Sequence, residues 1–128
     1  MDARKILIVD DSKNIRKLIT VVLKNEGYQF IEAANGLDAL AKARQERPDL
    51  IILDIMIPGP DGLKVCREIK RGPRTKGIAV MILTSESSNE SRDASLEAGA
   101  DMFLTKPFEP KTLKEAVRSI LHGSNETK

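Results

Sequence analysis

The feature of this sequence that most constrains its fold is the regular alternation of short apolar runs with longer stretches of helical periodicity. Runs of strand length occur at Lys5 to Val9, Gln29 to Ala33, Leu50 to Leu53, Ile78 to Leu83 and Asp101 to Leu104. Several of them are almost unbroken in apolar character, which is typical of strands that are buried on both faces in a parallel sheet. Each run is followed by a segment long enough for a helix.

The segments between the strands carry the signals of amphipathic helices. Two of them place apolar residues at intervals of three and four, which gives one buried face. These faces consist of Ile15, Leu18, Ile19, Val22 and Leu23 in the first helix and Leu113, Ala116, Val117, Ile120 and Leu121 in the last. Ser12, Asn35 and Asp61 are predicted to cap three helices, and Gly27 to end the first. The fourth helix follows an almost wholly polar stretch, so we expect only Leu96 and a few alanines to hold it.

Five strand-helix units predict an α/β protein, with a five-stranded parallel sheet in a doubly wound three-layer sandwich. The hydrophobic content of 41% is sufficient to fill one core in a chain of 128 residues. We therefore expect a single domain over residues 1–122 and a flexible tail over residues 123–128.

Composition argues against several classes of function. The chain has 21 basic and 19 acidic residues, a net charge of +2 and few aromatic residues, which disfavours a nucleic-acid surface. Its single cysteine, Cys66, excludes an internal disulfide and a multi-cysteine zinc site, and its apolar neighbours predict a core thiol. The apolar runs are too short to span a bilayer and the start of the chain lacks a signal-peptide pattern, so we expect a soluble cytoplasmic protein with no membrane partner.

Polar residues stand where four of the predicted strands end. Asp10 and Asp11 follow the first strand, Asp54 the third, Thr84 the fourth, and Lys106 the fifth. In an open parallel sheet, ligands bind beyond the carboxyl ends of the strands, at the point where the strand order reverses. Taken singly, these residues also have simpler explanations, since Asp11 can cap a helix and Thr84 can bond to nearby backbone.

The three carboxylates indicate a metal ion, because at one sheet edge they would repel one another without a cation. A Mg²⁺ site uses a small number of carboxylates together with water and phosphate oxygens, whereas a calcium site would need more oxygen ligands from the protein. An aspartate beside such an ion can attack phosphorus and form an acyl phosphate, and the Lys106 ammonium can stabilise the phosphoryl oxygens.

Together these residues resemble the receiver domain of two-component response regulators, in the form of a single domain like the chemotaxis regulators. The resemblance extends from Lys5 to Leu121 and includes the Lys106-Pro107 dipeptide. One departure is Pro60, where the family often has methionine or leucine. The resemblance implies a flavodoxin-like topology with strand order 2-1-3-4-5.

The resemblance also implies roles for the site residues. Asp54 would accept a phosphoryl group, Asp11 and Asp54 would bind Mg²⁺ directly, and Asp10 would bind it through water. The backbone carbonyl of Met56 would complete the protein ligands. Lys106 would pair with the phosphate, and its bond to Pro107 would be cis.

A conformational switch is implied as well. Thr84 would move its hydroxyl onto a phosphate oxygen, and Phe103 would turn inward as the hydroxyl leaves. An equally good interpretation makes Phe103 a half-buried strand residue. The face made by helix four, strand five and helix five would carry the signal.

The expected partners are a sensor histidine kinase or a histidine phosphotransfer protein, and a downstream protein target or a fused output domain. The only histidine, His122, lies near the end of the chain, so the phosphoryl group should come from a partner or a small donor. The protein would not be an enzyme beyond Mg²⁺-dependent self-phosphorylation from a donor and slow self-dephosphorylation.

Three other kinds of protein share part of this pattern. A haloacid-dehalogenase-type phosphatase needs a second aspartate two residues after the nucleophile, where this chain has Met56. A flavodoxin-like cofactor protein needs a Ser/Thr/Gly-rich phosphate loop after the first strand, in place of Asp10 and Asp11. The third is a receiver-like interaction module that is never phosphorylated, and the presence of all the acidic, hydroxyl and lysine positions argues against it.

Overall fold

A parallel five-stranded sheet forms the centre of the computed structural model, which describes residues 3–123. Its strands are β1 Lys5–Val9, β2 Gln29–Ala33, β3 Leu50–Leu53, β4 Ala79–Thr84 and β5 Met102–Thr105. They lie in the order β2-β1-β3-β4-β5, so the strand order reverses between β1 and β3. The predicted fold class and strand order are confirmed, and the fourth and fifth strands begin and end one residue later than predicted.

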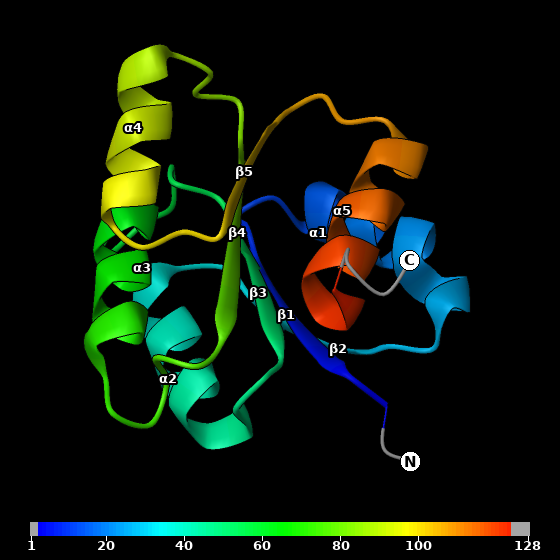
Figure 1. Ribbon diagram of the computed structural model, residues 1–128, viewed down its shortest axis with the longest axis horizontal. Helices are drawn as coiled ribbons and strands as arrows, with labels where there is room; N and C mark the ends of the chain where they lie inside the picture. The colour runs from blue at the N-terminus through cyan, green and yellow to red at the C-terminus, as the bar shows by residue number, and fades with distance from the viewer. Residues whose placement is uncertain (1–2, 124–128) are drawn as a thin grey trace.

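Helices cover both faces of this sheet, as Figure 1 shows. One face carries α1 Lys13–Leu23 and α5 Pro110–His122, and the other carries α2 Gly36–Glu46, α3 Gly62–Arg71 and α4 Asn89–Glu97. A short 3-10 helix, Lys24–Glu26, follows α1. Gly27, with a φ of 86°, ends this 3-10 helix, so the first α-helix stops earlier than predicted.

The core is divided in two because each strand sends alternate side chains to opposite faces. In β1, Leu7 and Val9 pack with residues of α2 and α3, whereas Ile6 and Ile8 pack with residues of α1 and α5. Full burial of a side chain of this size contributes about 1.5–3 kcal/mol. The same apolar residues that predicted a strand therefore hold helices against both of its faces.

Three helices begin at the predicted side-chain caps. The hydroxyl of Ser12 accepts a hydrogen bond from the N–H of Ile15 at 3.2 Å. Asn35 and Asp61 accept from the N–H three residues further on, at 2.8 and 2.9 Å. Each such cap contributes about 1 kcal/mol and fixes where the chain leaves a strand-end loop and enters a helix.

Two leucines predicted to be buried are exposed instead. Leu18 is 48% exposed, because the inward face of α1 runs through Ile19 and Leu23. Leu96, which was expected to hold the fourth helix, is also 48% exposed, and the buried residue of α4 is Ser95. α4 therefore has even less apolar anchoring than the sequence predicted.

Cys66 is a core residue, as predicted. Its thiol is buried in α3 and donates to the carbonyl of Ala98 at 3.5 Å. Burial raises the pKa of this thiol to about 11, since the thiolate is poorly solvated there. The thiol therefore stays protonated at neutral pH.

Two further expectations concern membrane-spanning segments and the C-terminal tail. Within residues 3–123, no helix has the length and apolar character needed to cross a bilayer. The predicted tail, residues 123–128, lies outside the described residues except for Gly123, which ends α5.

Candidate functional site

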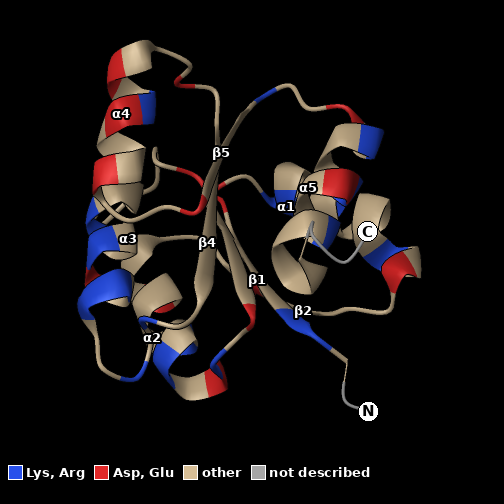
Figure 2. Ribbon diagram, in the orientation of Figure 1, with Lys and Arg blue, Asp and Glu red and all other residues tan. Residues whose placement is uncertain are grey.

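Two aspartates meet at the carboxyl ends of the central strands. Asp10 directly follows β1 and Asp54 directly follows β3, and these strands are neighbours, with Val9 paired to Leu53. The N–H of Asp54 donates to the carbonyl of Val9 at 3.0 Å, which extends the sheet ladder to the aspartate. Figure 2 shows acidic positions gathered in the loops at this edge of the sheet. The reversal of strand order therefore brings the two carboxylates together.

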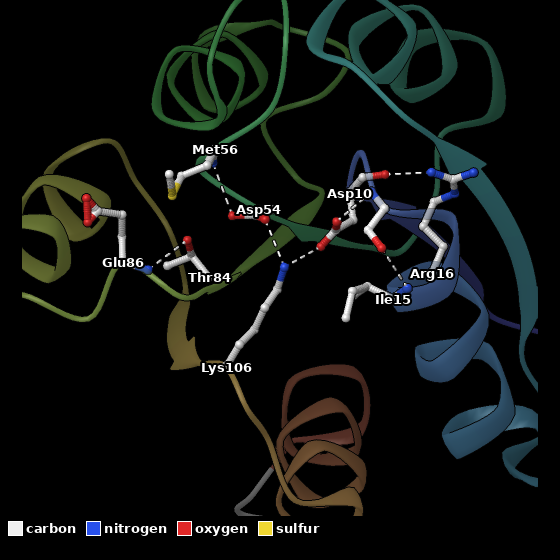
Figure 3. Close-up of polar contacts among 9 residues, drawn as sticks. Asp10, Ile15, Arg16, Asp54, Met56, Thr84, Glu86 and Lys106 are labelled. Carbon is white, nitrogen blue, oxygen red and sulfur yellow. Dashed lines mark hydrogen bonds and ion pairs between the residues drawn. The ribbon is translucent and has the colours of Figure 1, made fainter.

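Both carboxylates are buried and share one cation. The exposed fraction is 2% for Asp10 and 5% for Asp54. The Nζ of Lys106 donates to Oδ2 of Asp10 at 2.6 Å and to Oδ2 of Asp54 at 2.9 Å, as Figure 3 shows. Burial by itself lowers the pKa of Lys106, but the hydrogen bonds to the two carboxylates outweigh it, so the pKa is raised. Lys106 is therefore a permanent ammonium at neutral pH.

The backbone after β5 places Lys106 at this site. The N–H of Lys106 donates to the carbonyl of Thr84 at 2.9 Å, which continues the pairing of β4 with β5. The peptide bond between Lys106 and Pro107 is cis, as predicted. The ammonium thus reaches the carboxylates from the far edge of the sheet.

The second oxygen of each carboxylate is held by backbone. Oδ1 of Asp10 accepts the N–H of Ser12 at 3.0 Å, and Oδ1 of Asp54 accepts the N–H of Met56 at 3.1 Å. Hydrogen bonds from N–H groups favour a charged carboxylate and fix its plane. The side chain of Met56 is exposed, and only its backbone contacts Asp54 directly.

The structure brings the predicted carboxylates together only in part. Asp11 is exposed, whereas Asp10 and Asp54 are buried. No group of three or more His, Cys, Asp and Glu side chains within residues 3–123 is arranged to hold a metal ion. The predicted three-carboxylate cluster is therefore not preformed.

The residues present nevertheless fit a magnesium ion. Asp10 and Asp54 carry two negative charges against the one positive charge of Lys106, and Asp11 adds a further negative charge. The resulting excess matches a divalent cation. Mg²⁺ takes one or two protein carboxylates, keeps several waters and accepts a phosphate oxygen, so it does not require a closed cage of side chains.

Thr84 and Phe103 occupy the neighbouring strands β4 and β5. Thr84 is fully buried, and its hydroxyl accepts a hydrogen bond from the N–H of Glu86 at 3.2 Å. The hydroxyl therefore keeps its own proton available to donate. Phe103 is half-buried and packs against the core on the side of α2 and α3. This position agrees with the interpretation of Phe103 as a half-buried strand residue.

Arg16 is a residue of this site that the sequence interpretation missed. Its Nη1 donates to the backbone carbonyl of Asp10 at 2.7 Å, and its Nε donates to Oε1 of Glu32 at 2.8 Å. Its position in the sequence could have indicated this role. Arg16 lies three residues before Ile19 and seven before Leu23, so it shares the buried face of α1 with them. A cation on a stripe of buried residues indicates a partner inside the fold.

Comparison with known proteins identifies the family. The response regulator receiver domain matches residues 6–118. The transcriptional regulatory protein ResD of Bacillus subtilis is 39% identical over 96% of this chain and 50% of its own length. The chain thus spans about half the length of the curated relatives it matches.

Solved structures give the same result. The chemotaxis response regulator CheY4 of Vibrio cholerae has a TM-score of 0.87 and 35% identity, covering 94% of this chain and 100% of that one. The receiver domain of the sensor histidine kinase PA1611 of Pseudomonas aeruginosa has a TM-score of 0.86 and 28% identity, covering 94% and 98%. That structure holds a magnesium ion coordinated in its active site cleft. The chain described here belongs to the receiver domain family of two-component response regulators.

Proposed function

We propose that Asp54 accepts a phosphoryl group from a phosphohistidine of a sensor histidine kinase or a histidine phosphotransfer protein. The observation that carries this proposal is the pair of buried carboxylates, Asp10 and Asp54, joined by the Lys106 ammonium at the switch point of the sheet. A second candidate, a receiver-like module that is never phosphorylated, has no observation in its favour. The working unit is residues 1–122, acting in the cytoplasm.

The transfer itself needs one bond made and one broken. A carboxylate oxygen of Asp54 attacks the phosphorus and the phosphorus–nitrogen bond of the donor breaks. Its electron pair returns to the ring nitrogen, and a proton on the other ring nitrogen of the phosphohistidine makes the leaving group a neutral imidazole. The product is an acyl phosphate on Asp54. Attack of water on its phosphorus releases inorganic phosphate and regenerates the carboxylate, so the protein is a switch that resets slowly and not a turnover enzyme.

Mg²⁺ would be held by Asp11 and Asp54 directly, by Asp10 through water, and by the backbone carbonyl of Met56. When bound, the ion neutralises charge on the incoming phosphoryl oxygens. The buried position of Asp54 limits the access of water to its carboxylate. Lys106 lies 2.9 Å from Asp54, from where its ammonium can move onto a phosphoryl oxygen.

Phosphorylation of Asp54 would change the conformations of Thr84 and Phe103 and, through them, the surface formed by α4, β5 and α5. The buried Thr84 hydroxyl has a proton to donate to a phosphate oxygen. Its movement would change the packing near Phe103 of β5, whose partner on β4 is Ile82, two residues before Thr84. α4 is weakly anchored, so a small change at this end of β4 can shift its packing. The recipient of the signal is a protein target or a fused output domain.

The acceptor is tested by mixing the protein with Mg²⁺ and acetyl phosphate. We expect one hydroxylamine-labile phosphate per chain, none in Asp54→Asn, and none when EDTA removes the metal. Asp61→Asn is the matched control, because asparagine caps a helix as well as aspartate does and the phosphate should be retained. Phosphate that persists in Asp54→Asn would refute the assignment.

A further inference from the structure

We propose that Arg16 is a positioning residue for the magnesium site, which orients the Asp10–Asp11 turn, and that Glu32 holds Arg16 in place for this task. The inference rests on the proposed function, since it concerns the ion needed for phosphorylation of Asp54. Arg16 itself would contact neither the ion nor the phosphoryl group. It would act through the backbone that carries two of the metal ligands.

The contact of Arg16 with Asp10 fixes a peptide group. The side chain is 14% exposed, and its Nη1 donates to the carbonyl of Asp10 at 2.7 Å. That carbonyl belongs to the peptide bond between Asp10 and Asp11, so holding it fixes the direction in which the Asp11 side chain leaves the backbone. Within residues 3–123, the Asp11 carboxylate forms no hydrogen bond or ion pair of its own. Its position therefore depends on its backbone.

Glu32 supplies the other half of the arrangement. Its Oε1 accepts from Nε of Arg16 at 2.8 Å, and its backbone carbonyl accepts from Nζ of Lys42 at 2.6 Å. Lys42 also pairs with Asp38, at 3.2 Å, within α2. The guanidinium of Arg16, which lies on α1, is thus held between the end of β1 and β2 by two different donor nitrogens. A lysine has one nitrogen and cannot reproduce this planar fork.

Charge and geometry make opposite predictions for this residue. As a cation near the metal site, Arg16 should repel Mg²⁺, so its neutral replacement would strengthen metal binding by electrostatics alone. As a positioning residue, it should make binding tighter, because partners that orient metal ligands typically contribute roughly 10–100-fold to affinity. The sign of the change therefore separates the two roles.

The test is a Mg²⁺ titration of the full chain followed by amide chemical shifts, without any phosphate donor. We expect the dissociation constant of Mg²⁺ to rise roughly 10-fold in Arg16→Lys, which keeps the charge, and also in Arg16→Gln, which removes it. Unchanged affinity in Arg16→Lys, or tighter binding in Arg16→Gln, would overturn the inference. Circular dichroism of each variant checks that it is folded.

A matched control lies on the same face of the sheet. Arg118 of α5 pairs with Glu26 at 2.8 Å, the same distance as the Arg16–Glu32 pair, and neither residue belongs to the site. Arg118→Lys and Arg118→Gln should leave Mg²⁺ affinity unchanged. A loss as large as that of the Arg16 variants would show that the effect does not depend on the contact with the Asp10 carbonyl, and would overturn the inference.

The role of Glu32 is tested by a double-mutant cycle. Glu32→Gln should weaken Mg²⁺ binding in the wild-type background and cause no further loss in Arg16→Gln, because Glu32 acts through Arg16. Additive losses would overturn that part of the proposal. If the wild-type protein fails to bind Mg²⁺, the proposed function fails and this inference with it, whereas normal wild-type binding with an unaffected Arg16→Lys overturns this inference alone.

Discussion

At the scale of single residues, Lys106 joins three strand ends of the site. Its ammonium holds the carboxylates of Asp10 and Asp54 together, and its amide joins β5 to β4 through Thr84. A buried carboxylate without a partner is costly, because it loses its hydration without compensation. Lys106 is therefore both a structural counter-ion and a candidate contact for the phosphoryl group.

Lys106→Met removes the shared ammonium and leaves Asp10 and Asp54 facing each other. We expect the free energy of unfolding in Mg²⁺-free buffer to fall by about 3 kcal/mol, the lower end of the range for breaking a buried pair. Urea unfolding with and without Mg²⁺ measures the effect, and the ion should restore part of the loss. Equal stability of the two proteins in EDTA would contradict the counter-ion role.

The same pair of proteins gives a pH prediction. The pKa of Lys106 is raised above its ordinary value of 10.5 in the folded state, so its contribution to stability is fully present below that value. It is lost as the pH rises through the higher folded-state pKa. The stability difference between the wild-type protein and Lys106→Met should therefore be constant near neutral pH and shrink only in strongly alkaline buffer. If this difference in stability already shrinks below about pH 9, a group other than Lys106 is responsible for it.

At the scale of elements, the start of α3 packs directly against the backbone of Asp54, the proposed phosphate acceptor. A Cβ at Gly62 would lie 2.3 Å from the backbone oxygen of Asp54 and 2.5 Å from the Cα of Ile55. The N–H of Gly62 also donates to the carbonyl of Ile55 at 2.8 Å. Only a residue without a side chain lets the helix approach this loop so closely. The position of Asp54 therefore depends on the helix that follows it.

Gly62→Ala tests this close approach. We expect it to lower the free energy of unfolding by roughly 1–3 kcal/mol, the usual cost of overpacking, and to shift the amide resonances of Asp54 and Ile55. Gly77→Ala is the matched control, because a Cβ there would meet nothing within 4 Å. It should change stability by less than about 1 kcal/mol. Similar losses in both variants would contradict the packing argument.

α4 is the element from which we expect the largest response to phosphorylation. A beryllofluoride adduct, which mimics the phosphoryl group, should perturb the amide signals of Thr84, Phe103 and residues 86–98. The reason is that α4 has a single buried side chain, Ser95, and an exposed Leu96. Asp54→Asn should show none of these changes. Perturbation confined to the immediate neighbours of Asp54 would argue against a switch.

At the scale of the whole molecule, the site joins elements that are far apart in the sequence. Asp10, Asp54 and Lys106 follow β1, β3 and β5, and each strand belongs to the same sheet with a core on both faces. These groups separate when the sheet unfolds. An ion bound by them should therefore stabilise the whole domain and not only a loop.

Mg²⁺ at about 100 times its dissociation constant should raise the free energy of unfolding by about 2.7 kcal/mol. Asp54→Asn should lose most of this gain, since the buried ligand is weakened. The control is Asp93→Asn, an exposed position on α4, which should keep the gain. Chemical unfolding at several Mg²⁺ concentrations measures the dependence, and a gain of equal size in all three proteins would point to a general salt effect.

Much of this architecture could be predicted from local patterns. The apolar runs located all five strands to within one residue, and Ser12, Asn35 and Asp61 cap helices as expected. The errors arose where burial depends on neighbours in space. Leu18 and Leu96 fit a helical period yet lie on exposed faces, because periodicity gives the angle between residues but not the direction of the packed neighbour.

The sequence by itself determined the α/β class, the strand-end positions of Asp10, Asp54, Thr84 and Lys106, and the family to which they point. Only the tertiary structure decided that Lys106 bridges two buried carboxylates, that Asp11 is exposed, and that Arg16 holds the Asp10 carbonyl. The physical reason is that strand and helix signals act over a few residues, whereas these contacts join groups up to 96 positions apart. Their distances and charges exist only once the sheet has formed.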